Sequence, residues 1–535
     1  MEFLLYNFNG ELFDTVHGGA LELNRDRLNR AQGKLTIQFQ IPILDLNGYW
    51  KPDLFRPRMQ LDWKIRLESA GNRNFPYIAL FNASHRNRWS FFSTNLVDDT
   101  VIELAMNQQE CRYDVKIAIA VTPETEPFAL RFDNRPVPWP QLLQSCRDRL
   151  GLSASVVPAG AWEPVYCTWY ARHAALTVEF LDEAAEQAAD LGVGTFIVDD
   201  GWSYDRAARV TPESAPTWYE EIGPWRVSAA KLPGFAEHVR RTRRLGLRYL
   251  LWTAPFFLGA KSLQNREVPI VGGEPGSFGV FDPACREEMA RMLREHRELF
   301  RNYSLDGVKL DFLAHIPSNP DHPHGRTAWQ AIRELTDAIR QENPQALIEF
   351  RQFYSTPATL GLATQFRAND TPFDCLENLH RVAQLRLMLG DGIAVHADPA
   401  CWHPQESAEN VARHMVAAIA GVPMVSMDLA RLSDEHRGIL RDSLNFYRKH
   451  QEFFRRAHWS VRYDGDQLAS LTAEREGRRI VWLVSAAGLP DAEGACCVLN
   501  PSGITWRLNS GELLTPGRWL EQTAMTEGVS GNNAK

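Results

Sequence analysis

The chain has 535 residues, 44% hydrophobic and 23% charged, so it is long and apolar enough to bury a large core in about two to four domains. Its 58 basic and 66 acidic side chains give a net charge of −8 with no basic stripe, so nucleic acid is not an expected partner. The most apolar stretch, 249–260, is too short to cross a bilayer, and no signal peptide is visible. We therefore expect a cytoplasmic protein without membrane contact. The eight cysteines, at irregular spacings, indicate reduced thiols.

The first 135 residues are predicted to form an N-terminal β domain. Apolar residues alternate with polar ones over 35–41, and again from Met59 through Trp63 to Leu67, which is the period of strands with one buried face. Several such strands indicate a sandwich. A proline-rich stretch with a short helix, 136–163, is expected to connect this domain to the next one.

After the connector, short apolar runs alternate with amphipathic stretches. Helices are predicted over 177–191, 234–245, 286–300 and 406–420. Strand-then-helix units of this kind indicate a (β/α)₈ TIM barrel over 164–452. The eight runs expected as buried strands are 164–170, 195–200, 247–255, 307–312, 346–352, 364–370, 394–399 and 423–429.

The rest of the chain returns to a β pattern. Runs at 478–485 and 503–513 predict a small C-terminal β domain over 453–525, followed by a polar tail at 526–535. The expected fold class is therefore α/β, a (β/α)₈ barrel flanked by an N-terminal β-sandwich-like domain and a small C-terminal β domain. A doubly wound open sheet is the alternative, but no glycine-rich dinucleotide loop follows the first strand of the barrel region.

Nearly every predicted barrel strand ends in polar or ionisable residues. In a barrel, the carboxyl ends of the strands form the active face, and burying so many charges there is costly unless they pair or serve a ligand. Ion pairs or helix caps account for single members such as Asp306 and Asp428, but less well for the whole set. That set is Asp199, Asp200, Lys309, Asp311, Arg351, Arg367, Asp370, His396, Asp398 and Asp428.

Two of these carboxylates fit the cleavage of a glycosidic bond, which needs one group to attack the anomeric carbon and one to protonate the leaving oxygen. Asp311 ends the fourth strand and Asp370 follows the sixth. Lys309 lies two residues before Asp311, faces the same side, and is expected to keep it ionised as a nucleophile must be. Asp370, as the acid, needs a pKa raised by burial or by the nearby anion.

The sequence combines VDDGW at 198–202, the segment 231–252, DGVKLDF at 306–312 and RANDT at 367–371. Together with CTWY at 167–170 and the stretch from His396 to Leu429, these motifs resemble glycoside hydrolase family 36, the α-galactosidase and raffinose-synthase group. The resemblance covers about residues 160 to 450. It implies a retaining, metal-independent and cofactor-free enzyme acting on α-linked galactosides or oligosaccharides.

The resemblance also implies roles for individual residues. Asp311 matches the nucleophile of the family and Asp370 its acid/base. Asp199 and Asp200 match the carboxylates that hold sugar hydroxyls, including the axial O4 of galactose. The other positions implied to bind substrate are Trp202, Trp252, Lys309 and Arg367.

The chain departs from the family pattern at several points. The N-terminal β region is shorter than in large members. The sequence therefore leaves open whether Trp50, Trp63, Trp89 or none of them forms an aromatic wall of the sugar site. The nucleophile motif has leucine where many members have tryptophan. Arg351 stands where many members have a small residue, and we include it among the substrate-binding residues, since it could bind an acidic sugar through two parallel hydrogen bonds. It could equally pair with Glu349 or Asp311.

The sequence also allows other interpretations of the site and of the function. Histidines and a cysteine in two loops could suggest a metal, but prolines and a missing fourth ligand argue against one: His322, His324, His396, Cys401 and His403. A galactosyltransferase would use the same covalent intermediate, an acidic α-sugar would use Arg351, and an inactive carbohydrate-binding protein would lose one carboxylate, although both are present. Whether identical copies assemble is not decided.

Overall fold

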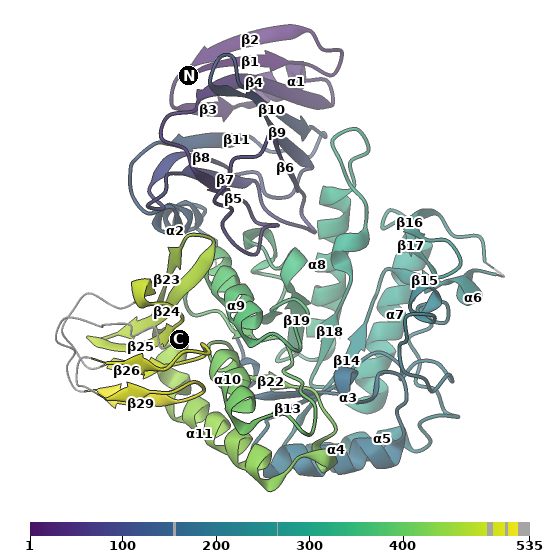
Figure 1. The fold of residues 1–535 in the computed structure, drawn as a ribbon. Coiled ribbons are helices and arrows are strands. Elements are labelled where there is room, and N and C mark those ends of the chain that lie inside the picture. The colour runs from purple at the N-terminus through teal and green to yellow at the C-terminus, as the bar shows by residue number, and fades with distance from the viewer. Residues whose placement is uncertain (153–156, 265, 489–495, 509–511, 523–535) are drawn as a thin grey trace.

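The computed structural model describes residues 1–152, 157–264, 266–488, 496–508 and 512–522. Figure 1 shows a β-rich N-terminal part in purple, a barrel ringed by helices in blue and green, and a sheet near the C-terminus in yellow. This arrangement confirms the predicted fold class. Within the described ranges, no helix is long and apolar enough to span a bilayer.

The N-terminal part is a sandwich of two antiparallel sheets. Alternation over 35–41 builds its core, since Leu35, Ile37 and Ile41 are at most 3% exposed. The six-stranded sheet contains, in spatial order, β2 (Leu12–His17), β1 (Glu2–Tyr6), β4 (Lys34–Pro42), β10 (Arg112–Ala120), β9 (Thr100–Asn107) and β6 (Lys64–Ser69). The five-stranded sheet contains β3 (Ala20–Leu23), β11 (Phe128–Asp133), β8 (Asn87–Ser93), β7 (Tyr77–Phe81) and β5 (Gly48–Trp50). Two helices, α1 (Arg25–Arg30) and α2 (Trp139–Arg149), accompany them.

The strand expected from Met59 to Leu67 begins later than predicted. β6 enters the edge of its sheet only at Lys64, so the residues before it are not part of the ladder. Trp63 lies just outside, and its side chain is 67% exposed, although its carbonyl accepts from the Met106 amide at 2.9 Å. The expectation of a buried Trp63 was wrong, because the alternating pattern extends beyond the point where the chain joins the sheet.

All eight predicted barrel strands are present and pair in parallel. Bridges from His396 to Val422 and from Ala400 to Val425 bring the last two strands together and close the ring. In spatial order the strands are β21 (Val395–His396), β20 (Gln365–Arg367), β19 (Leu347–Arg351), β18 (Gly307–Leu310), β14 (Arg248–Thr253), β13 (Thr195–Val198), β12 (Val165–Cys167) and β22 (Met424–Val425).

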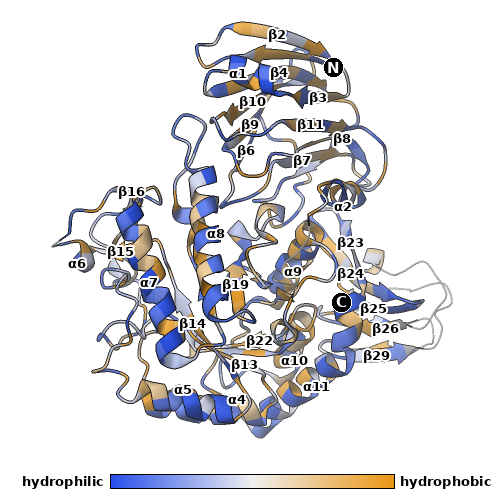
Figure 2. Cartoon of the chain, turned by 180° about the vertical axis from the view of Figure 1, so that it is seen from behind, coloured by the Kyte–Doolittle hydropathy of each residue, from blue (hydrophilic) through white to orange (hydrophobic). Residues whose placement is uncertain are grey.

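Amphipathic helices surround the barrel. In α5, Phe235, His238, Val239 and Thr242 are buried at helical spacing, and Figure 2 shows the same mixture of hydrophilic and hydrophobic residues along α4, α5 and α7. The helices are α3 (Trp169–Arg172), α4 (Val178–Asp190), α5 (Phe235–Arg244), α7 (Arg286–Tyr303), α8 (Gly325–Glu342), α9 (Cys375–Leu389), α10 (Ala408–Ala418) and α11 (Asp434–Arg456).

Three smaller sheets complete the described chain. After β14, a three-stranded sheet contains, in spatial order, β15 (Phe257–Gly259), β17 (Phe278–Phe281) and β16 (Ile270–Glu274). Along the chain, α6 (Ala260–Leu263) lies between β15 and β16. The predicted C-terminal β region contains a sheet of β23 (His458–Asp464), β24 (Gln467–Arg475), β25 (Arg478–Leu483), β26 (Cys496–Leu499) and β29 (Trp519–Gln522). A two-stranded pair of β27 (Trp506–Arg507) and β28 (Leu513–Leu514) lies between β26 and β29 along the chain.

The sandwich contacts the carboxyl-end face of the barrel. Asn72 Nδ2 donates to the Leu313 carbonyl at 3.0 Å, just after β18. Arg326, at the start of α8, pairs with Asp98 at 2.8 Å. The N-terminal sandwich therefore borders the strand ends that carry the polar residues (Figure 1).

Candidate active site

The barrel brings the predicted site residues to one end. Asp199 follows β13, Asp311 follows β18, Arg351 ends β19 and Asp370 lies in the turn after β20. Because these strands are parallel and adjacent or nearly so, their carboxyl ends point the same way. Three of these residues contact one another, because Arg351 pairs with both Asp311 and Asp370.

Asp311 is 5% exposed and surrounded by hydrogen-bond donors. Its Oδ2 accepts from Trp252 Nε1 at 3.0 Å. Its Oδ1 accepts from the Phe312 amide at 2.8 Å and from the Tyr354 hydroxyl at 3.3 Å, and Arg351 Nη2 lies 2.9 Å away. Such donors fix the carboxylate and stabilise its charged form.

The charges around Asp311 decide its ionisation. Burial by itself raises the pKa of Asp311, but the cations Arg351, Lys309 and Arg367 outweigh burial and hold the pKa well below its usual range. Asp311 is therefore ionised at neutral pH, which is the state required of a nucleophile.

Phe312, next to Asp311, has an unusual backbone conformation. Its φ is 58°, in the left-handed region that non-glycine residues seldom adopt. Its ring stacks on Phe257 at 5.0 Å and packs edge-on to Trp252. Strained residues of this kind persist where surrounding packing holds them, and they cluster at active sites.

Asp370 has an arginine on each oxygen. Arg367 Nη1 donates to Oδ1 at 2.9 Å and Arg351 Nη1 donates to Oδ2 at 3.1 Å. The side chain is 47% exposed, so a ligand can reach it. Partial burial raises the pKa of Asp370, yet Arg367 and Arg351 outweigh burial and the repulsion of Asp311, so the pKa is lowered. This direction is opposite to the raised pKa expected for an acid.

Arg351 bridges the two carboxylates. One terminal nitrogen contacts Asp370 and the other contacts Asp311, while the guanidinium lies 4.8 Å from the centre of the Phe312 ring. Of the two roles left open by the sequence, the structure displays the ion pair. The side chain is 12% exposed.

Asp199 lies 2.6 Å from the Lys309 ammonium. Both side chains are buried, and the Cys167 thiol donates to the same oxygen of Asp199 at 3.1 Å. Asp199 raises the pKa of Lys309 although burial acts in the opposite direction, so the lysine stays charged. The pair fixes the Asp199 carboxylate beside β18, the strand that precedes Asp311.

Asp200 is a second buried carboxylate. Its Oδ2 accepts from Trp218 Nε1 at 2.7 Å and from the Tyr204 hydroxyl at 3.1 Å, whereas its Oδ1 is buried without a partner. Burial and the neighbouring Asp199 raise the pKa of Asp200 to about 6, against the effect of these donors. An unpaired buried oxygen is costly unless a ligand hydroxyl reaches it.

The two predicted pocket tryptophans differ in position. Trp252 donates to Oδ2 of Asp311. Trp202 is fully buried, donates to the Trp252 carbonyl at 2.8 Å and packs against Trp225. Trp202 therefore holds the backbone of Trp252 in place through this hydrogen bond.

Arg367 organises a network that the sequence revealed only in part. Its Nη1 donates to both Asp370 and the fully buried Asp398, and its Nε lies 3.8 Å from Glu349. Burial raises the pKa of Asp398 to about 7 despite Arg367, with Asp370 adding to the rise. Asp398 stands at the end of the seventh predicted strand, and this position already placed it among the candidate site residues.

Sequence reasoning missed Tyr354, Tyr170 and the aromatic rim. Tyr354 and Tyr170 donate to Asp311 and to Asp398 at 3.3 and 3.5 Å. Tyr170 belongs to the CTWY motif but was given no role, and Tyr354 belongs to none of the motifs. Of the tryptophans considered for an aromatic wall, Trp50 and Trp89 are buried, whereas Trp63 is exposed. Two exposed aromatic residues lie in the segments that follow β19 and β20. They are Phe353, whose ring lies 5.8 Å from that of Phe55 in the sandwich, and Phe373.

Other ionisable residues have structural partners. Asp428 pairs with Arg172 at 2.9 Å, and Asp306 pairs with Arg243 at 3.1 Å, as their interpretation as ion pairs predicts. Asp374 caps α9 by accepting from the Glu377 amide. Among the described residues, no group of three or more His, Cys, Asp and Glu is arranged to hold a metal ion.

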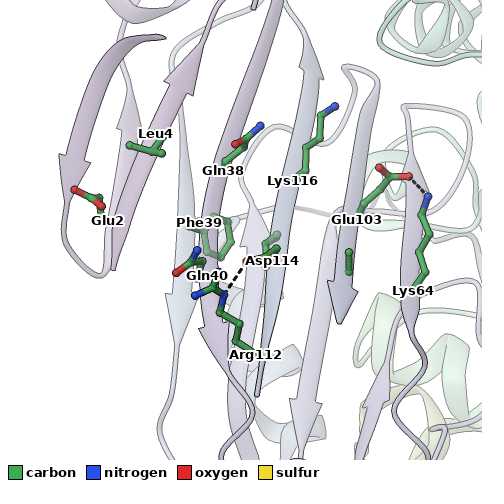
Figure 3. Close-up of a pocket in the computed structure, with 12 residues that line it drawn as sticks. Glu2, Leu4, Gln38, Phe39, Gln40, Lys64, Glu103, Arg112, Asp114 and Lys116 are labelled. Atoms are coloured by element: carbon green, nitrogen blue, oxygen red, sulfur yellow. Dashed lines mark hydrogen bonds and ion pairs between the residues drawn. The ribbon is translucent and has the colours of Figure 1, made fainter. Parts of the chain in front are cut away.

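A groove of about 790 Å³ lies elsewhere, on the outer face of the six-stranded sheet (Figure 3). Its charged side chains pair with one another, Lys64 with Glu103 at 3.1 Å and Arg112 with Asp114 at 3.0 Å. These residues come from the sandwich strands and not from the barrel strand ends. The groove therefore contributes nothing to the carboxylate network.

The chain is similar in sequence to two curated proteins that are named as α-galactosidases. No family model matches the chain. A bifunctional α-galactosidase/sucrose kinase of Mediterraneibacter gnavus is 21% identical over 316 residues, covering 53% of this chain and 31% of that protein. An α-galactosidase of Escherichia coli is 26% identical over 204 residues, covering 37% of this chain and 25% of that protein. The matches thus span less than a third of each curated relative.

Solved structures match nearly the whole chain. A glycoside hydrolase family 36 α-galactosidase from Geobacillus stearothermophilus, in complex with 1-deoxygalactonojirimycin, superposes with a TM-score of 0.66 at 14% identity over 99% of this chain and 87% of that chain. An α-galactosidase from Thermus thermophilus, in complex with p-nitrophenyl α-D-galactopyranoside, gives a TM-score of 0.58 at 17% identity over 88% of this chain and 95% of that one. The chain has the fold of glycoside hydrolase family 36 α-galactosidases, as its motifs predict.

Proposed function

We propose that the chain is a retaining α-galactosidase that cleaves terminal α-galactosides through a covalent glycosyl-enzyme intermediate. The observation that carries this proposal is the pair Asp311 and Asp370, joined by one guanidinium at the strand ends of a barrel with the family 36 fold. Retaining glycosidases need two carboxyl groups close together, about 5–5.5 Å apart.

In the first step, Asp311 attacks the anomeric carbon as the bond to the leaving oxygen breaks, and Asp370 protonates that oxygen. In the second step, Asp370 accepts a proton from water, the water oxygen bonds to the anomeric carbon, and Asp311 leaves as a carboxylate. The strongly lowered pKa of Asp311 supports its assignment as nucleophile, since it stays ionised while buried.

The proposed sugar contacts lie on the other side of the nucleophile strand. Asp199, held by Lys309, and Asp200, with its unpartnered Oδ1, are suited to accept hydrogen bonds from ring hydroxyls. Inverting one hydroxyl would leave a buried carboxylate partly unsatisfied, so the site should discriminate strongly between sugars that differ at C4.

The test is to measure kcat/KM for aryl α-galactoside, α-glucoside, and a uronic or sulfated analogue. We expect the galactoside to be cleaved and the glucoside to be a poor substrate. Equal rates for galactoside and glucoside would refute the galactose assignment. Adding an acceptor sugar and analysing the products separates hydrolysis from galactosyl transfer, which would use the same intermediate.

A further inference from the structure

Both oxygens of Asp370 are occupied by arginine donors, Arg367 on Oδ1 and Arg351 on Oδ2. An acid that protonates a leaving oxygen must carry a proton on one oxygen and direct it toward the substrate. Protonation removes the negative charge and makes the protonated oxygen a poor acceptor, so the arginine contact on that oxygen is weakened when Asp370 becomes an acid.

The two arginines differ in how firmly they are held. The Arg367 side chain is 3% exposed and also contacts Asp398 and Glu349, so its position is fixed from several sides. Arg351 is more exposed, at 12%, and it keeps Asp311 and the Phe312 ring as anchors if its Nη1 contact with Asp370 is released. The Arg351 contact is therefore the one expected to break.

The position of Arg351 gives a reason for the release. The scissile bond of a retaining reaction lies between the two carboxyl groups, and Arg351 joins these same two groups. A sugar that brings its anomeric carbon to Asp311 and its leaving oxygen to Asp370 competes with the Nη1 contact.

The charges at this end of the barrel argue against an alternative use of Arg351, the binding of an acidic sugar. Carboxylates outnumber cations, so no positive charge is left over for an anionic substrate, and Arg351 already serves two carboxylates. The carboxylates are Asp199, Asp200, Asp311, Glu349, Asp370 and Asp398, and the cations are Lys309, Arg351 and Arg367.

We propose that Arg351 is a positioning residue that couples sugar binding to proton uptake: it holds Asp370 as a carboxylate in the free enzyme and releases it when a neutral sugar enters. This inference rests on the proposed glycosidase function. On release, Asp370 takes one proton from solvent, gives it to the leaving oxygen, and later gains a proton from the attacking water. It returns this last proton to solvent when the product leaves and the Arg351 contact forms again.

Every charged group facing Asp370 enters this coupling. Arg367 comes from β20, Arg351 from β19, Asp311 and Lys309 from β18 and its end, and Asp398 from the strand-end loop after β21. From α9, Arg381 contacts only the Asp370 carbonyl, at 3.5 Å. Among these groups, Arg351 combines direct contact with Asp370 and freedom to withdraw.

The test is the pH dependence of KM and kcat measured separately on a neutral aryl α-galactoside. Proton uptake on binding makes KM rise with pH, by up to about tenfold per pH unit, above the free-enzyme pKa of Asp370, while kcat stays flat until the pKa of the complex is reached. Arg351→Met removes one of the two arginines in direct contact with Asp370, so it should raise the free-enzyme pKa of Asp370 by about 1 unit or more, and the rise of KM should begin at higher pH.

Two further variants separate this role from a structural one. Arg351→Lys keeps the charge but reaches one carboxylate at a time, so its KM profile should lie between those of wild type and Arg351→Met. Arg172→Met, which removes the Asp428 pair on the same face of the barrel, should keep the wild-type profile. Circular dichroism establishes that each variant is folded.

The outcomes are distinct. A wild-type enzyme that cleaves galactosides with a pH-independent KM, or folded Arg351 variants with the wild-type KM profile, would overturn the coupling and leave the proposed function standing. An inactive wild type would overturn the proposed function itself. If Arg351→Met selectively loses a sulfated or uronic substrate, the arginine binds an acidic sugar and the coupling is wrong.

Discussion

The ammonium of Lys309 lies 2.6 Å from Oδ2 of Asp199, and both side chains are buried. The contact links β18, which is followed by the proposed nucleophile Asp311, to β13, which is followed by the proposed sugar-binding carboxylates. A buried pair of this kind is geometrically fixed, because either charge alone would be left without a partner in a low-dielectric environment.

Removal of this lysine should be strongly destabilising. Lys309→Met leaves Asp199 buried without its cationic partner, so we expect the free energy of unfolding to fall by about 3–5 kcal/mol. The matched control is Lys449→Met, whose pair with Glu521 is exposed on both sides and should be worth less than about 1 kcal/mol. Urea unfolding of both variants measures the difference, and similar losses would contradict the importance of burial.

Asp311→Ala should abolish turnover while the fold persists, because no other carboxylate reaches the anomeric carbon from that strand end. We expect a loss of at least roughly 10³-fold in kcat. A small anion such as azide should restore part of the activity on a substrate with a good leaving group. Asp306→Ala removes a paired carboxylate at the other end of β18 and should keep turnover. Near-wild-type activity of Asp311→Ala would refute its role.

Asp370→Asn should slow substrates with poor leaving groups far more than those with good ones, since an acid matters only when the leaving oxygen needs a proton. General acid catalysis contributes about 10²–10⁴-fold, and the loss should approach this range for the poorest leaving group. The measurement is kcat/KM across a series of aryl galactosides. An equal loss for all of them would assign the acid elsewhere.

The raised pKa of Asp398 predicts a pH dependence of stability. Its pKa is about 7 in the fold against an ordinary 3.8, so the folded state binds this proton more tightly and gains stability at low pH. That contribution, up to about 4 kcal/mol, is present below pH 4 and lost as the pH rises to 7. Asp398→Asn should lose less stability than wild type between pH 5 and 7.5 in urea unfolding. An unchanged difference would contradict the raised pKa.

Much of the fold follows from local patterns. All eight barrel strands were predicted because each is a short apolar run ending in polar residues, and fully buried parallel strands have this composition. The pattern was less reliable at Trp63, because alternation shows which face a residue would occupy in a strand and not where the strand joins its sheet.

The site was predicted unevenly for a similar reason. Asp311, Asp370 and Asp199 stand at strand ends, which the sequence indicates directly. The partner of Lys309 depends on the distances between strands of the barrel, which the sequence does not give. Lys309 was expected to act on Asp311, but it contacts Asp199, and Arg351 is the cation in contact with Asp311. Phe55 and Phe353 meet across two domains, and no local pattern encodes such a contact.

The most direct test of the account is to find which residue becomes covalently attached to the sugar. The enzyme is incubated with a slow-reacting fluorinated α-galactosyl fluoride, and its peptides are mapped by mass spectrometry. We expect one fluorogalactosyl adduct, on the peptide that contains Asp311 and at that residue. An adduct on another carboxylate, or turnover of the reagent without any adduct, would contradict Asp311 as the nucleophile of a retaining α-galactosidase.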